Sequence, residues 1–375
     1  MCIRDRATDI QAAVCRTVGE PLEIEVVQLD DPAPDEVRIG VAGSGLCHSD
    51  LHVIDGSLPA PLPVILGHEV SGVVLEVGHQ IQGLEVGDHV VAGISAHCDS
   101  CRCCAAGKTW LCERRSSPGL RSENQPKIRV GETTIGGIGG LSGFAEQMGR
   151  HRSAAVPIDP EMPLDRAALI GCAVVTGVGT VINAARVRPG ETCAVIGCGG
   201  VGLNVVQGAR LAGAGRIVAV DLQASKLELA ERFGATDLVN AGDGDPVEAV
   251  LGLTGGRGVD HSFEVIGLKS TSEQALAMAT DGGAAYLIGV LPPGLALEVP
   301  GTEFVLGNKT LCGVRMGSSN MASDFPYFVE LYQQGRLLID ELVAERITLA
   351  QVNEGYDKMR TGDQARSVIT FDRPN

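Results

Sequence analysis

The chain has 375 residues, enough for about two domains with separate hydrophobic cores. Hydrophobic residues make up 44% of the sequence and charged residues 20%, a balance that excludes a disordered chain, and 50 glycines indicate many tight turns. The formal net charge of -16 argues against nucleic acid or an anionic membrane as the main partner, because both bind basic surfaces.

The first part of the chain has the pattern of short β-strands. Residues 1–9 show no periodicity and are expected to be a frayed end. Beyond them, runs of alternating apolar residues are separated by glycine- and proline-rich turns; these runs are residues 22–26, 37–39, 70–74 and 89–91. We therefore predict a β-rich domain, similar to a barrel, that carries its functional residues on loops.

Two motifs among these strands supply metal ligands. Cys47 begins Cys-His-Ser-Asp, and His68 lies in Gly-His-Glu. A thiolate and a neutral imidazole are ligands that zinc favours, and a catalytic zinc needs about three ligands and one open position. Cys172, in Ile-Gly-Cys-Ala, is our candidate for the third ligand. Because the three are far apart in sequence, only a folded domain can bring them together, which favours a catalytic site.

Four cysteines in one short stretch predict a second metal site. The spacing is C-x2-C-x2-C-x7-C, formed by Cys98, Cys101, Cys104 and Cys112. Four thiolates around zinc make a closed structural site with no position for substrate. An iron–sulfur cluster is the alternative for four cysteines. Cys103 is out of register, and we interpret it as a bystander.

The middle of the chain carries fewer signals. Residues 113–143 are predicted to be irregular, with turns at paired glycines. The uncharged run from residue 167 to 185 has nearly the length of a membrane span, but glycines and polar residues interrupt it, so we interpret it as a buried interdomain segment. No export signal is found, so a cytoplasmic protein is expected, and in that reducing compartment 12 cysteines more often indicate metal ligands than disulfides.

From residue 192 the pattern changes to alternating strands and helices. A buried strand at 192–196 is followed at once by Gly-Cys-Gly-Gly-Val-Gly and a helix. In this G-x-G-x-x-G fingerprint Gly197 permits a tight turn, Gly199 lets the backbone approach a pyrophosphate, and Gly202 lets helix and strand pack closely. These features predict a dinucleotide site.

The strand predicted at residues 217–220 is followed by Asp221, an acidic residue that is expected to select the cofactor. Asp221 can accept hydrogen bonds from an adenosine ribose and repels a 2′-phosphate, so we predict NAD rather than NADP. Further strands are predicted at residues 217–220, 238–239, 259–265, 284–288 and 310–314, with helices around 227–233, 272–279 and 325–334. Six strands fit a doubly wound sheet.

These motifs, in this order, resemble the zinc-dependent alcohol dehydrogenases of the medium-chain dehydrogenase/reductase superfamily from about residue 11 to the C-terminus. The resemblance implies an α/β protein with a GroES-like β-rich catalytic domain in residues 1–173 and 315–375. It also implies a Rossmann coenzyme domain, a doubly wound parallel sheet, in residues 174–314. Two zinc ions per chain, NAD, a small alcohol or aldehyde substrate, and a homodimer or a tetramer are expected.

The resemblance also assigns roles around the predicted catalytic zinc. Ser49 matches the hydroxyl that takes the alcohol proton, and His52 matches the imidazole that passes it to solvent. Asp50 matches a carboxylate that orients the ligand histidine, and Glu69 matches an acid beside the metal. Contacts to the cofactor are implied for His48, Thr176, Gly197, Gly199, Val201, Gly202, Asp221, Lys226 and Arg366.

Four aliphatic residues match positions that line the substrate pocket: Leu58, Ile94, Ile138 and Val290. They favour primary alcohols or aldehydes with apolar tails, aliphatic or aromatic, over polyols. A thiol-dependent formaldehyde dehydrogenase is the alternative enzyme, since that branch shares both zinc sites. A catalytically silent nucleotide-binding scaffold is the alternative of another class, and the complete ligand set argues against it. The role of Arg315 is open.

Overall fold

The computed structural model describes residues 7–115, 117–120, 127–361 and 366–372. The chain divides into two compact units: unit 1 is Met1–Cys172 with Asn320–Asn375, and unit 2 is Ala173–Ser319. The sequence-based boundary placed residues 315–319 with the first domain, whereas the structure places them with unit 2. The reason is local: the Asn183 side-chain amide donates to Ser319 Oγ at 3.1 Å, and Gly317 packs against the backbone of Val175.

In the described part of unit 1, one group of strands closes into a barrel in the order β1-β2-β7-β8-β4. The strands are β1 (Thr8–Cys15), β2 (Glu23–Leu29), β4 (Val64–Ile65), β7 (Ile128–Val130) and β8 (Thr133–Gly137). The last two lie in the stretch predicted to be irregular, so that prediction was wrong. Ile128 and Ile135 face each other across this hairpin and are both buried, but strands this short give little periodicity to read.

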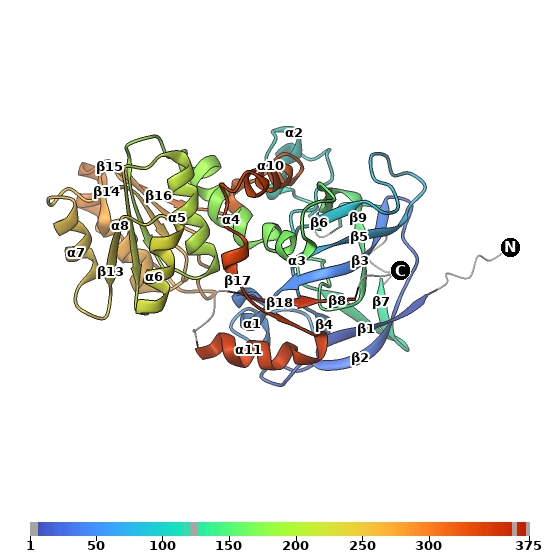
Figure 1. Ribbon diagram of the computed structural model, residues 1–375. Helices are drawn as coiled ribbons and strands as arrows, with labels where there is room; N and C mark the ends of the chain where they lie inside the picture. The colour runs from blue at the N-terminus through green and yellow to red at the C-terminus, as the bar shows by residue number, and fades with distance from the viewer. Residues whose placement is uncertain (1–6, 116, 121–126, 362–365, 373–375) are drawn as a thin grey trace. The chain divides into compact units, whose positions relative to one another are not determined.

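A second sheet of unit 1 joins the two ends of the chain. Its order is β10-β6-β5-β3-β18-β17, with β9 also paired to β3. The strands are β3 (Glu36–Gly45), β5 (Glu69–Val77), β6 (His89–Ala92), β9 (Gln147–His151), β10 (Ala155–Pro157), β17 (Val343–Ile347) and β18 (Arg366–Thr370). Figure 1 shows the blue β3 beside the red β18, and Val368 pairs with Gly45 in antiparallel register. Every residue of β3 is buried, so this strand forms the centre of the unit.

Short helices complete unit 1. They are α1 (His48–Ile54), α2 (Arg102–Ala105), α3 (Leu164–Ala167), α10 (Met321–Gln333), α11 (Val352–Thr361) and the one-turn segments η1 (Thr109–Leu111), η2 (Arg152–Ala154), η3 (Ala168–Gly171), η6 (Asp340–Leu342) and η7 (Leu349–Gln351). Helix α11 buries Tyr356 against Phe144, with ring centroids 6.2 Å apart. A hydrophobic core thereby links the C-terminal helix to the barrel.

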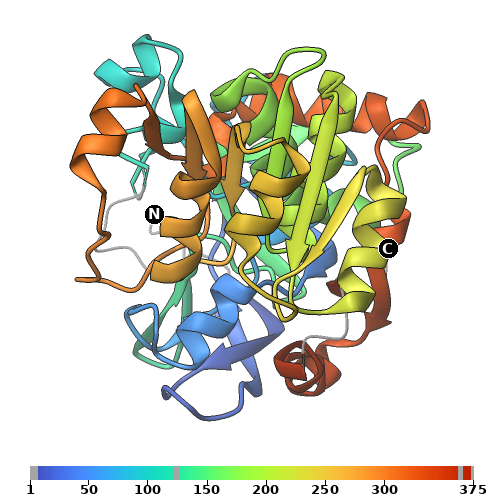
Figure 2. The same ribbon diagram turned by 90° about the vertical axis from the view of Figure 1, so that its left-hand side faces the viewer.

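Unit 2, described throughout residues 173–319, contains a six-stranded parallel sheet with the order β13-β12-β11-β14-β15-β16. Its strands are β11 (Thr192–Ile196), β12 (Arg216–Asp221), β13 (Asp237–Asn240), β14 (Val259–Glu264), β15 (Ala279–Leu287) and β16 (Thr310–Gly313). Its helices are α4 (Ala173–Gly179), η4 (Thr180–Ala185), α5 (Gly200–Ala212), α6 (Ala224–Phe233), α7 (Pro246–Leu253), α8 (Lys269–Met278), α9 (Gly301–Leu306) and η5 (Met316–Ser318). Figure 2 shows helices in front of and behind the sheet. The predicted doubly wound sheet is confirmed.

The strand order of unit 2 reverses between β11 and β14, because the chain runs outward to β13 and then returns to the other side of β11. In doubly wound sheets ligands bind beyond the carboxyl ends of the strands at such a switch point. The fingerprint Gly197–Gly202 follows β11 directly and leads into α5. The fold therefore places the predicted dinucleotide motif where this architecture binds ligands.

The uncharged run forms helical turns rather than one long helix. Among the described residues no single helix is long and apolar enough to cross a membrane. One pair, Leu164–Gly171 and Ala173–Ala185, passes by length and composition but is bent by 53° between its two halves. Residues 167–181 and 185 are buried, as predicted for this segment, whereas residues 182–184 are partly exposed.

Candidate functional site: two zinc centres and a dinucleotide motif

The three predicted ligands of the catalytic zinc converge within unit 1. Cys47 directly precedes α1, His68 directly precedes β5, and Cys172 follows η3. Their ligand atoms all lie within 4.8 Å of one another, and all three side chains are buried. Two sulfurs and one imidazole nitrogen suit zinc, and three donors leave a fourth tetrahedral position open. The residues present therefore fit a catalytic zinc.

Asp50 fixes the orientation of His68. Its Oδ1 lies 3.0 Å from His68 Nδ1 and also accepts the Gly67 backbone N–H at 3.1 Å. With Nδ1–H donated to this carboxylate, Nε2 keeps its lone pair for a metal. Asp50 is 0% exposed, so the pair is shielded from water. The geometry agrees with the orienting role that the resemblance implied.

The electrostatics of this cluster favour the thiolate at Cys47 and leave the protons on Cys172 and His68. A hydrogen bond from Cys172 and the positive charges of His68 and Arg366 hold the pKa of Cys47 well below its usual range. Cys172 is the partner that keeps its proton, so its pKa is raised well above the usual value. Burial lowers the pKa of His68, but the negative charges of Asp50 and Cys47 outweigh burial and raise it well above normal. A cation bound here would replace the proton that these groups share.

A buried ion pair lies against the ligand cluster. Glu69 is 0% and Arg366 is 4% exposed, and Arg366 Nε lies 3.5 Å from Glu69 Oε1. Arg366 Nη2 is also 3.9 Å from Cys47 Sγ. Burial raises the pKa of Glu69 to about 8, and the Arg366 charge opposes that rise. The structure thus places Arg366 beside the metal ligands of unit 1; its expected diphosphate contact stays a prediction.

The predicted proton-transfer residues lie on helix α1. Ser49 Oγ is 3.9 Å from Cys47 Sγ, which places this hydroxyl beside the ligand cluster. His52, one turn later, is half-buried, and its Nδ1 lies 3.0 Å from Ser57 Oγ. Because residues three apart lie on the same face of a helix, Ser49 and His52 share one face of α1. His48 is exposed at the start of the same helix.

The predicted pocket residues divide between the two units. Leu58 and Ile138 pack against the core that contains Leu46, and Ile94 packs against the neighbouring core of unit 1. Ile94 also lies next to Gly139, directly after Ile138. Val290, in unit 2, is 59% exposed. The structure therefore brings the segments of Ile94 and Ile138 together, and the pocket itself stays a prediction.

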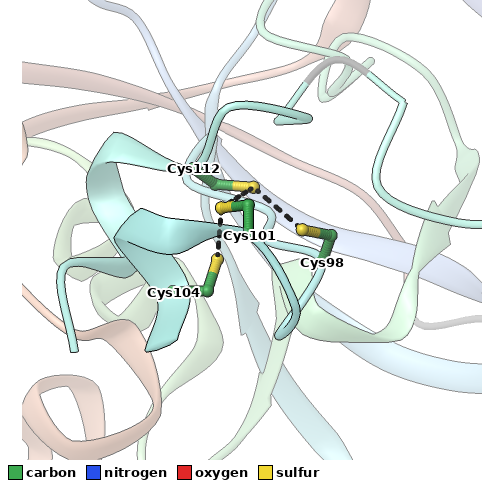
Figure 3. Close-up of side chains that lie close together, drawn as sticks. All are labelled: Cys98, Cys101, Cys104 and Cys112. Atoms are coloured by element: carbon green, nitrogen blue, oxygen red, sulfur yellow. Dashed lines mark hydrogen bonds between the residues drawn. The ribbon is translucent and has the colours of Figure 1, made fainter. Parts of the chain in front are cut away.

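The four predicted cysteines form one compact group (Figure 3). Sulfur–sulfur distances are 3.4 Å for Cys101–Cys104, 3.9 Å for Cys101–Cys112 and 3.7 Å for Cys98–Cys112. Zinc–sulfur bonds in a tetrahedron imply sulfurs roughly 3.8 Å apart, so the group fits one zinc. The Ser100 backbone N–H lowers the pKa of Cys98 to about 6, which favours the thiolate.

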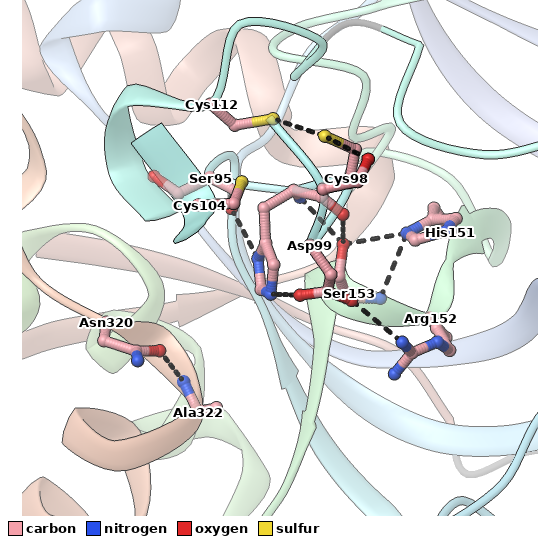
Figure 4. A network of polar contacts seen from close by, with 12 residues as sticks. Ser95, Cys98, Asp99, Cys104, Cys112, His151, Arg152, Ser153, Asn320 and Ala322 are labelled. Atoms are coloured by element: carbon pink, nitrogen blue, oxygen red, sulfur yellow. Dashed lines mark hydrogen bonds and ion pairs between the residues drawn. The ribbon is translucent and has the colours of Figure 1, made fainter. Parts of the chain in front are cut away.

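A polar network supports the loop that carries these cysteines, and sequence reasoning missed it (Figure 4). Asp99 adopts a left-handed backbone with φ of 56° and pairs with Arg152 at 2.9 Å and with His97 at 3.2 Å. Ser153 Oγ donates to the carbonyl of His97 and accepts its backbone N–H. The sequence signal that could have indicated this network is Asp99, a charged residue between the ligands Cys98 and Cys101. Cys103 lies outside the four-sulfur group, 4.0 Å from a carboxylate oxygen of Glu113.

The glycine fingerprint has the geometry expected of each glycine. Gly197 has φ of 98°, a conformation that side chains rarely adopt. A Cβ on Gly199 would meet nothing within 4 Å, which leaves its backbone open to a ligand. A Cβ on Gly202 would collide with the carbonyl oxygen of Gly197, so only glycine allows helix and strand to approach this closely. Val201 lies between Gly200 and Gly202 in the first turn of α5.

Asp221 ends β12 beside this turn. Its Oδ2 accepts the Cys198 backbone N–H at 2.7 Å and its Oδ1 accepts the Gln223 backbone N–H at 3.0 Å. The carboxylate is thus held next to the fingerprint while remaining partly exposed. Lys226, in the first turn of α6, is also partly exposed. Thr176 is buried in α4 and donates to Met316 Sδ at 3.8 Å.

Comparisons with known proteins agree with both units. The family described as alcohol dehydrogenase GroES-like domain matches residues 33–160, and zinc-binding dehydrogenase matches residues 200–334. S-(hydroxymethyl)glutathione dehydrogenase of Synechocystis sp. is 37% identical, covering 96% of this chain and 99% of the relative. NDMA-dependent alcohol dehydrogenase of Amycolatopsis methanolica is also 37% identical, covering 96% and 98%.

Among solved structures, benzyl alcohol dehydrogenase from Acinetobacter calcoaceticus is 31% identical with a TM-score of 0.92, covering 97% of this chain and 100% of that chain. The similarity therefore extends over both units rather than over one shared domain. Together with the two family matches, it makes the chain a member of the zinc-dependent alcohol dehydrogenases of the medium-chain dehydrogenase/reductase superfamily.

Proposed function

We propose that the chain is an NAD-dependent dehydrogenase that interconverts primary alcohols and aldehydes, with zinc at Cys47, His68 and Cys172 and a second zinc at the four-cysteine group. The observation that carries this proposal is the convergence of three buried ligands with one coordination position to spare. When bound, zinc supplies a Lewis acid for the alcohol oxygen and NAD supplies the hydride acceptor.

The chain's own residues handle the proton that the alcohol loses. In this proposal Ser49 accepts it, supported by its Oγ lying beside the ligand cluster, and His52 passes it toward solvent, supported by its partial exposure on the same face of α1. Asp50 keeps the His68 ring in the tautomer that a metal requires.

The choice of NAD over NADP rests on Asp221. Its carboxylate is anchored by two backbone N–H groups next to the fingerprint, where an adenosine ribose would lie. A 2′-phosphate there would meet a fixed negative charge. We therefore expect NADP to be used poorly.

The substrate class rests on aliphatic side chains. Leu58, Ile94 and Ile138 offer no hydrogen-bond donor or acceptor in their side chains, so a polyol would lose hydration there without compensation. The structural relative from Acinetobacter is a benzyl alcohol dehydrogenase, which supports an apolar, aromatic-tolerant pocket. We propose primary alcohols with aliphatic or aromatic tails.

Initial rates of NAD reduction with ethanol, hexanol, benzyl alcohol and sorbitol, measured with zinc content on the same sample, test this proposal. We expect turnover of the apolar primary alcohols, little turnover of sorbitol, and about two zinc per chain. Replacing NAD with NADP should lower kcat/KM by about a hundredfold or more. Zinc-loaded protein that oxidises no alcohol would refute the proposal.

One relative favours a second candidate function. The Synechocystis protein is an S-(hydroxymethyl)glutathione dehydrogenase, and this chain covers 99% of it at 37% identity. The substrate of such an enzyme is the adduct of formaldehyde and a thiol. The same assay with formaldehyde plus glutathione separates the two functions, since turnover that requires the thiol would assign the chain to this second class.

A further inference from the structure

Arg150 is a buried arginine on β9 with no role in the proposed chemistry. Its side chain is 3% exposed, and it pairs with Val37 in the register of β9 and β3. Glu36, a carboxylate whose charge acts on Arg150, is also buried and is bound by Lys127 at 2.6 Å. Burial lowers the pKa of Arg150 to about 10, with Glu36 opposing, so the guanidinium stays charged at neutral pH. Burying a charge is costly, so its contacts require a reason.

The contact that Arg150 makes is to a tight turn. Its Nη2 donates to the carbonyl oxygen of Gly139 at 3.0 Å. A Cβ on Gly140 would overlap the guanidinium group, so the arginine lies directly under the turn. Within the turn, the backbone bonds run from Gly140 N to Gly137 O and from Leu141 N to Ile138 O. A charged donor from a neighbouring strand therefore fixes the tip of the turn.

This turn is joined on both sides to the segment that leads to a metal ligand. The Ile138 N–H donates to the carbonyl of Ile65 at 3.3 Å, and the Gly143 N–H donates to the carbonyl of Gly67 at 2.9 Å. His68 is the next residue. On the opposite side, a Cβ on Gly139 would approach the Ile94 side chain to 2.7 Å, so the turn and Ile94 are in close contact.

We propose that Arg150 is a positioning residue that holds the turn 137–141 and thereby sets the spacing of Ile94 and Ile138, the wall that selects the alcohol. The inference rests on the proposed function, because it assigns those two side chains to the substrate pocket. An arginine suits the task because its planar, fixed donors reach a carbonyl in a buried space. An apolar residue would fill the volume and leave the turn unanchored.

Arg150→Met tests the inference, with Arg38→Met as the matched control. Arg38, the neighbouring buried arginine on β3, is 5% exposed and bonds to Thr8, Asp31 and Glu76, far in sequence from the turn. Each variant removes one buried guanidinium from the same sheet. Glu36 keeps Lys127 in Arg150→Met, so no carboxylate loses its only partner. Arg150→Lys tests rescue by a retained charge.

For Arg150→Met we expect the ratio of kcat/KM for benzyl alcohol to that for ethanol to change by about tenfold, mainly through KM, as expected for the loss of one charged hydrogen bond. Arg150→Lys should recover part of this change. In Arg38→Met the ratio should stay at the wild-type value while thermal stability falls. Zinc content should equal that of wild type in all three variants.

Hydrogen exchange of the backbone amides in residues 137–144 provides a readout that needs no activity. Exchange there should accelerate at least tenfold in Arg150→Met and remain unchanged in Arg38→Met. Unchanged exchange at the turn, or an equal change of selectivity in both variants, would overturn the inference. If wild type oxidises no alcohol, the proposed function fails, and the exchange measurement still decides whether Arg150 holds the turn.

Discussion

The two cysteine clusters of unit 1 contain similar atoms but are built differently. Cys47, His68 and Cys172 come from three distant segments and are all buried. Cys98, Cys101, Cys104 and Cys112 come from one loop, and two of them are partly exposed. The first has three donors that only the whole fold brings together, whereas the second has four donors from one loop, which Arg152 and Ser153 support. A site with an open coordination position has only three ligands, so the surrounding fold must hold them in place. A closed site has four ligands, and the bound metal itself can fix the conformation of the loop.

The largest effect should come from breaking the three-ligand cluster. In Cys47→Ser we expect alcohol turnover to fall on the order of a thousandfold, because several kcal/mol of transition-state stabilisation are lost. Zinc content should fall from about two to about one per chain, since the four-cysteine group is intact. Steady-state rates and metal analysis check this. Wild-type turnover in this variant would contradict the assignment.

Breaking the four-cysteine group should have the opposite effect: stability should fall while turnover is preserved. Cys112 is fully buried among the other sulfurs, so Cys112→Ser should release that zinc and loosen the loop. We expect a loss of about 3 kcal/mol in stability, or roughly 6–12 °C in Tm. Turnover per folded molecule should be preserved. Calorimetry and rates measured at low temperature test this prediction. Lost turnover with an unchanged Tm would contradict a purely structural role for the four-cysteine group.

A milder change, Asp50→Asn, affects only the cluster of Cys47, His68 and Cys172. Asp50→Asn keeps the shape of the side chain but removes the negative charge that accepts the His68 Nδ1–H at 3.0 Å. We expect zinc affinity at Cys47, His68 and Cys172 to fall by about 10 to 100-fold. Titration with a competing chelator measures this directly. Zinc at the four-cysteine group should titrate as in wild type, and an equal shift at both sites would argue against a local effect.

The smallest effect should come from Cys103. Its sulfur lies outside the four-sulfur group and is half-buried near Glu113. Cys103→Ser should leave zinc content, Tm and turnover within experimental error of wild type. A thiol titration of the zinc-loaded protein should lose one reactive group. Loss of a zinc from this variant would show that the ligand set of the loop is different.

Sequence reasoning worked best where the signal is local. The four-cysteine spacing, the glycine fingerprint and the strand ending in Asp221 each need only a short segment, and the structure places all three as predicted in the fold. Cys172 was harder, because its partners are distant in sequence and only the fold brings it within 4.8 Å of Cys47 and His68. The resemblance to a known family supplied the roles of Ser49, His52 and the pocket residues.

Other features could not be read from the sequence for identifiable reasons. Strands β7 and β8 are too short to show alternation; they pair with each other, and their other partners, β2 and β4, come from distant segments. Residues 315–319 belong to unit 2 because of contacts with Asn183 and Val175, not because of any boundary signal. Arg150 is charged in a strand, a pattern that normally indicates solvent exposure. Its burial depends on Glu36 and Gly139, which only the fold brings near it.

The pairing of β18 with β3 has a consequence for the order in which the protein is made. Unit 2 is a continuous stretch, so it can fold as soon as residue 319 has left the ribosome. Unit 1 cannot finish then, because Val368 pairs with Gly45, two residues before Cys47, and Arg366 packs beside that ligand. Unit 2 is therefore expected to fold first, and the ligand cluster should reach its final form only after residues 366–370 have been made.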